Sequence, residues 1–151
     1  TLVPDAREQL TSNHGWDTRA HLAKLSAIIQ RFKQQGIRVS VFVDPDPIMV
    51  AYAVKAGADR VELYTGPYAE VYEHNPAEAI AMYRGAAEKA HELGIGLNAG
   101  HDLNLKNLSA FVQAFPWVDE VSIGQALIAD ALYLGIEETI KQYKYALSNS
   151  N

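Results

Sequence analysis

The sequence predicts an α/β fold in which parallel strands are joined by helices. Three observations carry this prediction. Segments with strand character alternate with segments of helical periodicity along the chain. No two strand segments are joined by a loop of hairpin length, so neighbouring strands are expected to run parallel. The strand segments are apolar and rich in β-branched residues, which is typical of strands covered on both faces.

Five segments have strand character, counting a stub at the start of the chain. They cover residues 1–4, 37–43, 60–65, 95–99 and 120–123. The second segment, "IRVSVFV", ends at "DPDP", because two prolines cannot continue a ladder of hydrogen bonds. The stub begins at Thr1 without a methionine, so we expect further residues before it.

Between the strands, apolar residues recur at helical spacing. Helices are expected from Asp17 or Thr18 to Gly36, over 47–56, from Pro76 to before Gly94, over 105–115, and from Gly124 onward with a break near Gly135. Aspartate or threonine can cap the first of them. Proline in the first turn and glycine after the last turn mark the ends of the third. Residues 66–75, "GPYAEVYEHN", are expected to form a loop.

Such a chain can close as an open doubly wound sheet or as a TIM (β/α)8 barrel. No G-x-G-x-x-G motif stands at a strand-to-helix turn, which disfavours the dinucleotide-binding form of the open sheet. Polar residues gather after the strand ends, where a barrel has its catalytic face. The pattern therefore favours a barrel. A closed barrel of this kind has eight strands, and the chain supplies about five, so the barrel is expected to be incomplete. Residues 1–151 are expected to form a single domain.

Composition excludes several classes of function. The chain has 151 residues, a net charge of −5 and no basic cluster, which disfavours nucleic acid as a partner. The absence of cysteine excludes disulfides and thiolate metal sites, and it agrees with a cytoplasmic location. No apolar run is long enough to cross a membrane. No pair of histidines has metal-ligand spacing, so no metal site is expected.

Two titratable residues near strand ends are candidates for chemistry. Glu62 lies between two apolar residues of a strand, where an unpaired carboxylate is costly to bury. It either faces the helices and pairs with a lysine, or points into a pocket and stabilises a cationic intermediate. His101 follows the small-residue turn "NAG". It suits proton transfer near neutral pH, and a structural role is the alternative.

The segment "SIGQALIADAL" joins a strand to a helix through Gly124. Free N–H groups at the start of such a helix can hold a phosphate, and barrel phosphate sites often lie after the last two strands. The alternative is a simple tight turn. No glycine–lysine pair indicates a nucleotide loop, and no serine stands in a nucleophile elbow.

Five blocks of the chain stand in the order found in one known family. They are "TLVPDAREQLTSNHGWD", "VSVFVDPDP", "AGADRVELYTGPYA", "GLNAGHDLNLKNL" and "VDEVSIGQALIADALYLG". Together they resemble the later part of the pyridoxine 5′-phosphate synthase family of vitamin B6 biosynthesis. The resemblance implies a TIM barrel lacking its first three strands here. It also implies condensation of 1-deoxy-D-xylulose 5-phosphate with 3-amino-2-oxopropyl phosphate, no cofactor, and a homo-oligomer.

The same resemblance implies roles for particular residues. His101, in "AGHD", would be a catalytic proton donor, and Glu62, in "VELYTG", a stabilising carboxylate. Thr11, the first hydroxyl of "LTSNHG", would contact the sugar phosphate. The site of the amino-ketone phosphate would be lined by Asp102, Gly124 and Gln125.

The chain departs from the family in two respects. Gln125 stands where the family usually has histidine, and glutamine can donate a hydrogen bond but cannot become cationic. The family takes a further catalytic histidine and glutamate from the segment without a counterpart here. The chain alone is therefore expected to be inactive or nearly so. The alternatives are a non-catalytic half-barrel that self-associates through open strand edges, or another phosphate-binding barrel enzyme.

Overall fold

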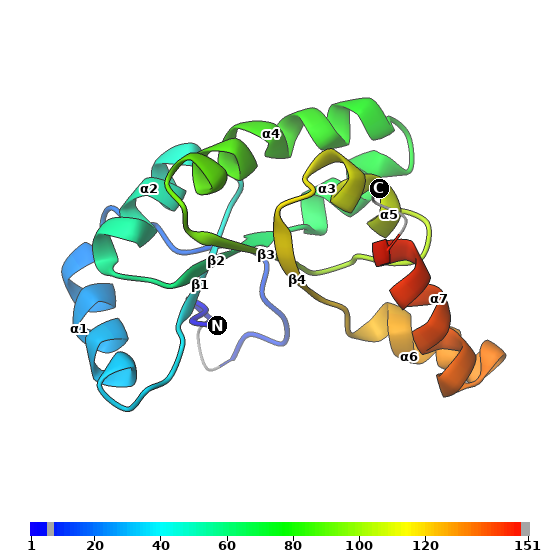
Figure 1. Cartoon of the computed structure of the whole chain (residues 1–151), viewed down its shortest axis with the longest axis horizontal. Helices are drawn as coiled ribbons and strands as arrows, with labels where there is room; N and C mark the ends of the chain where they lie inside the picture. Colours follow the sequence, from blue (N-terminus) through cyan, green and yellow to red (C-terminus); the bar gives the residue numbers. More distant parts are fainter. Residues whose placement is uncertain (6–7, 149–151) are drawn as a thin grey trace.

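A computed structural model describes residues 1–5 and 8–148 and contains a parallel sheet of four strands (Figure 1). The strands are β1 (Ser40–Val43), β2 (Arg60–Tyr64), β3 (Gly96–Gly100) and β4 (Val118–Ser122). Their order across the sheet is their order in the sequence. An open doubly wound sheet has a point where this order reverses, and no such point occurs among the described strands. The α/β class and the parallel sheet are thus confirmed.

One helix precedes the first strand, and the others lie in the connections between strands or after the last strand. They are α1 (Leu22–Lys33), α2 (Pro47–Ala56), α3 (Gly66–Tyr72), α4 (Pro76–Glu92), α5 (Leu108–Ala114), α6 (Gln125–Leu134) and α7 (Ile136–Ser148). In Figure 1, α1, α2 and α4 follow one another in an arc outside the sheet, with the N-terminal segment on the opposite side. Right-handed crossovers between strands in sequence order put connecting helices on one face. This layering is consistent with part of a barrel wall.

The hydrophobic core lies between the sheet and these helices. Alternate strand residues point into it, namely Val41, Val43, Val61, Leu63, Leu97 and Ala99. The helices contribute six alanines and several larger apolar side chains, among them the fully buried rings of Tyr68 and Tyr83. Complete burial of each large side chain stabilises the fold by roughly 1.5–3 kcal/mol. Because these residues point into the core, the residues between them point to the opposite face of the sheet.

The opposite face of the sheet carries the intervening residues, because side chains alternate along a strand. Phe42, Glu62 and Asn98 form one row across β1, β2 and β3. Tyr64 and Gly100 form the next row toward the carboxyl ends of the strands. Glu62 therefore points away from the helices, so of the two alternatives left open by the sequence the structure favours the one in which it points into a pocket.

Three expectations about local structure need correction. The segment expected to be a loop contains α3, because Pro67 suits a first helical turn and Tyr68 packs against Phe111 in the core. The stub at the start forms one parallel bridge, between Leu2 and Val41, instead of a strand. The first helix begins at Leu22, after a turn over residues 17–21.

No helix in the described ranges is long and apolar enough to cross a membrane. The solvent-exposed surface of α6 and α7 is nevertheless rich in apolar side chains. Several of their large side chains are exposed, namely Ile128, Leu132, Tyr133, Leu134, Ile136, Ile140, Tyr145 and Leu147. No residue of α6 is buried, in contrast to α2 and α4.

Candidate functional site

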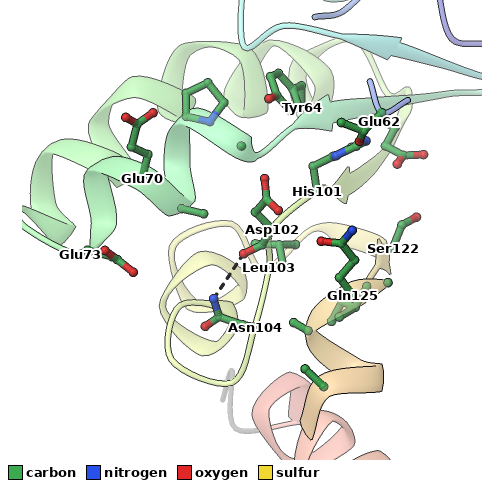
Figure 2. A pocket seen from close by; sticks show the side chains of 18 residues that line it. Glu62, Tyr64, Glu70, Glu73, His101, Asp102, Leu103, Asn104, Ser122 and Gln125 are labelled. Carbon is green, nitrogen blue, oxygen red and sulfur yellow. Dashed lines mark hydrogen bonds between the residues drawn. The ribbon is translucent and has the colours of Figure 1, made fainter. Parts of the chain in front are cut away.

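A cavity of about 1100 Å³ opens at the carboxyl ends of the strands (Figure 2). Its walls come from the segments that follow β2, β3 and β4, together with the N-terminal loop. All the site residues expected from the sequence line it, namely Thr11, Glu62, His101, Asp102, Gly124 and Gln125. Their placement in one cavity is a structural finding, whereas the chemical role of each remains a prediction.

Glu62 supplies a buried carboxylate, with 7% of the residue exposed. Its Oε2 accepts a hydrogen bond of 2.6 Å from the hydroxyl of Thr1. Its Oε1 lies against Gly100 of the neighbouring strand, where a Cβ atom would stand only 2.3 Å away. The described residues place no lysine or arginine in an ion pair with it. A glycine at position 100 is thus what leaves room for this carboxylate.

His101 stands where the chain leaves β3 through a left-handed backbone. The φ angles are +85° at His101 and +58° at Asp102, a conformation that costs residues with a Cβ roughly 1–2 kcal/mol each. Thr65, which is fully buried, holds this turn. Its N–H donates to the Gly100 carbonyl at 2.8 Å, and its hydroxyl lies 2.6 Å from that oxygen and 2.5 Å from the His101 carbonyl. Strained backbone of this kind often occurs at functional sites.

Thr11 is carried by a loop that is tied at one end to β1 and at the other to the residue that follows β1. Near the start, Leu2 accepts a hydrogen bond of 3.0 Å from the N–H of Phe42. Near the end, the N–H of Gly15 donates to Asp44 at 3.0 Å. A Cβ at Gly15 would lie 2.2 Å from the backbone nitrogen of Asp44, so only glycine permits this approach. The two attachments bring the threonine over the cavity.

Gly124 is the N-cap of α6, and it makes no side-chain capping bond. The first N–H groups of a helix lack partners within the helix, and the helix dipole makes this end partly positive. No heavy atom lies within 4 Å of a Cβ built at Gly124, so the backbone is open to a ligand. Gln125 begins the helix beside it and also lines the cavity. This wall suits an anionic group such as a phosphate.

Sequence reasoning missed several residues of the cavity, among them Glu70, Glu73 and Tyr64. Glu70 of α3, and Glu73 directly after the end of that helix, line the side opposite Ser122 and Gln125 (Figure 2). They were missed because their segment was expected to be a loop. Tyr64 was missed although its spacing of two from Glu62 puts both on one face of the strand.

The surroundings of Tyr64 disfavour ionisation of its hydroxyl. Burial raises its pKa, and the nearby carboxylate of Asp102 raises it further. A protonated phenol can donate a hydrogen bond into the cavity. Within the described residues, no group of three or more histidine, aspartate or glutamate side chains is arranged to hold a metal ion.

Comparison with known proteins gives a consistent set of relatives. The family model described as "Pyridoxal phosphate biosynthesis protein PdxJ" matches residues 1–149. The pyridoxine 5′-phosphate synthase of Bacteroides thetaiotaomicron is 63% identical over 147 residues, which are 97% of this chain and 62% of that protein. The enzyme of the same name from Bacteroides fragilis is 59% identical over 147 residues, with the same shares. That from Cytophaga hutchinsonii is 59% identical over 143 residues, 95% of this chain and 60% of that protein. The chain thus spans about 62% of the length of the curated relatives it matches.

Proposed function

Because the chain belongs to the pyridoxal phosphate biosynthesis protein PdxJ family, we propose that it forms the catalytic pocket of a pyridoxine 5′-phosphate synthase. The substrates are 1-deoxy-D-xylulose 5-phosphate and 3-amino-2-oxopropyl phosphate, and the products are pyridoxine 5′-phosphate, inorganic phosphate and water. One observation carries the proposal most directly. A buried carboxylate, a histidine and an open helix N-terminus line a single cavity at the carboxyl ends of parallel strands.

The reaction explains why these residue types stand together. An amine adds to a ketone, and water and phosphate leave before the ring closes, so each step moves a proton. His101 is the proton donor, since an imidazole can give and take protons near neutral pH. Intermediates of the iminium type carry positive charge, and the Glu62 carboxylate offsets it from within a site of low dielectric constant. Proton transfer and charge stabilisation of this kind need neither an organic cofactor nor a metal.

The two substrate phosphates are bound in different parts of the cavity. The amino-ketone phosphate lies against Gly124 and Gln125, where helix N–H groups and the neutral amide donate hydrogen bonds. Asp102 lines the same subsite. The sugar phosphate contacts the hydroxyl of Thr11 on the loop tied to β1.

We further infer that a complete (β/α)8 barrel and a homo-oligomer surround this pocket. The open strand edges and the apolar side chains exposed on α6 and α7 support this inference, because such surfaces favour association. The chain spans about 62% of its relatives, so residues 1–151 alone are expected to be inactive. A cytoplasmic location agrees with the absence of cysteine.

The proposal is tested by mixing both substrates with the intact protein that contains this chain. Pyridoxine 5′-phosphate is followed by mass spectrometry and released phosphate by a colorimetric assay. The expected result is one phosphate per product molecule, and no product from residues 1–151 alone. If the folded intact protein leaves both substrates unchanged, the assigned function is wrong.

A further inference from the structure

Three aromatic rings meet at the carboxyl ends of three neighbouring strands. The centroid of the His101 ring lies 5.4 Å from that of Phe42 and 5.3 Å from that of Tyr64. The rings of Phe42 and Tyr64 lie 5.5 Å apart, which closes the triangle. The Tyr64 and His101 rings meet at 83°, an edge-to-face arrangement that aromatic pairs favour. We call Phe42 and Tyr64 the aromatic cradle.

The cradle is itself rigid. Phe42 is 1% exposed and sits in the middle of β1. The ring of Tyr64 lies directly against Gly66, where a Cβ would stand 2.4 Å from its hydroxyl oxygen and 2.5 Å from Cζ. The backbone carbonyl of Tyr64 accepts a hydrogen bond from the buried hydroxyl of Tyr83. Burial therefore confines the ring of Phe42, and Gly66 flanks the ring of Tyr64, whose backbone is held by Tyr83.

Hydrogen bonds do not hold the imidazole of His101 in the described part of the chain. Its ring makes no hydrogen bond to another side chain or carbonyl within residues 1–5 and 8–148. The hydrogen bonds from Thr65 go to the backbone carbonyls of Gly100 and His101 and leave the ring free of them. A catalytic imidazole is commonly oriented by a hydrogen bond to its second nitrogen. Within the described part of the chain, the interactions that the structure shows for this imidazole are its ring contacts with Phe42 and Tyr64. Figure 2 shows His101 beside Tyr64 at the end of the cavity that Glu62 occupies.

On the basis of the proposed function, we propose that Tyr64 and Phe42 are positioning residues for His101. They fix the orientation of the imidazole by ring packing, so that its proton is presented to the substrate beside Glu62. The ring of Tyr64 orients the imidazole, and the hydroxyl of Tyr64 contributes little to this orientation. A catalytic group displaced by 1 Å loses roughly a hundredfold in rate, so the orientation of this ring governs turnover.

Three variants of the intact protein separate ring from hydroxyl. Tyr64→Phe keeps the ring and is expected to retain kcat within about threefold, because the aromatic packing persists. Tyr64→Leu removes it and is expected to lower kcat by roughly tenfold to a hundredfold with little change in KM. Tyr52→Leu, which removes a tyrosine of α2 outside the cavity, is the matched control and is expected to leave kcat unchanged.

The same Tyr64→Leu substitution is then made in a His101→Ala background. A residue that acts only through His101 has nothing left to position, so the double variant should be no slower than His101→Ala alone. A further loss equal to that seen in the wild-type background would overturn the proposal, because Tyr64 would then act on the substrate or the fold directly. Thermal unfolding confirms that each variant is folded. Should Tyr64→Leu not fold, Gly66→Ala displaces the same ring and is tested in its place.

A readout that does not depend on catalysis completes the test. In protein labelled with ¹³C at histidine, the Cε1–H resonance of His101 carries the ring-current shift of its two aromatic neighbours. The resonance should move in Tyr64→Leu and stay in place in Tyr64→Phe and Tyr52→Leu. An unmoved resonance in Tyr64→Leu would refute the cradle. If the wild-type protein makes no pyridoxine 5′-phosphate while this resonance behaves as expected, the proposed function fails and the cradle stands.

Discussion

Substituting Gly100 by alanine is predicted to displace Glu62 while leaving the protein folded. An added Cβ would stand 2.3 Å from Oε1 of Glu62 and 3.1 Å from Cβ of Ser122. Ordinary van der Waals contact begins at 3.4 Å, about 1.1 Å farther from the carboxylate oxygen than this. The carboxylate therefore has to move by about an ångström.

The substitution separates the effect on stability from the effect on catalysis. The atom in the way is the far end of a side chain that can rotate, so the cost in stability lies near the lower end of overpacking penalties, about 1 kcal/mol. For a protein of the relatives' size this lowers Tm by about 2–4 °C. A catalytic group moved by 1 Å, in contrast, loses on the order of a hundredfold in kcat.

The assay is the steady-state rate of pyridoxine 5′-phosphate formation at saturating substrate, with thermal unfolding measured in parallel. Gly85→Ala is the matched control, since it adds the same methyl group to α4, where the nearest atom is Pro47 Cγ at 3.3 Å. Its kcat is expected to equal that of the wild type. A Gly100→Ala protein with kcat within twofold of the wild type would show that the position of Glu62 does not matter to the reaction.

Three further changes test other parts of the account. Gly15→Ala sets a Cβ 2.2 Å from backbone that cannot rotate away, so it should destabilise the protein by roughly 2–3 kcal/mol. It should also raise KM for the sugar phosphate, because Thr11 lies on the loop that Gly15 attaches. An unchanged Tm and KM would contradict this prediction. The hydrogen bond from Lys33 lowers the pKa of Asp59 below 3.8, so this carboxylate stabilises the fold above that pH and the contribution is lost as pH falls through the lowered pKa. Asp59→Asn should therefore cost about 1 kcal/mol at pH 6, and the difference from the wild type in urea unfolding should shrink below pH 3.8; a constant difference would refute the assignment. Gln125→His should lower KM for 3-amino-2-oxopropyl phosphate more at pH 6 than at pH 8, because only the protonated imidazole adds a charge; equal changes at both pH values would argue against a phosphate at this position.

The order of strands and helices could be predicted because their signals are local. "IRVSVFV" before two prolines, and a helix between Pro76 and Gly94, need only propensity and punctuation to be recognised. The α3 helix could not be recognised in this way. Its glycine and proline signal a loop, and the burial of Tyr68 against residues far along the chain overrides that signal.

The cavity residues likewise differ in how far they could be predicted from local sequence signals. His101 and Gly124 stand after strand ends and could be found from position alone. The direction of Glu62 was ambiguous, because alternation tells which residues share a face but not which face meets the helices. The spacing of Tyr64 from Glu62 puts both on one face, but its contact with His101 could not be predicted, since contacts across strands depend on the register of the sheet.

The central claim, that His101 transfers protons in this pocket, is tested most directly by His101→Ala in the intact protein. Binding of each substrate is measured by calorimetry, and formation of pyridoxine 5′-phosphate is measured with both substrates present. We expect both substrates to bind with little change in affinity, and product formation to fall by roughly a hundredfold or more. A folded His101→Ala protein that binds both substrates and forms product at the wild-type rate would contradict the claim.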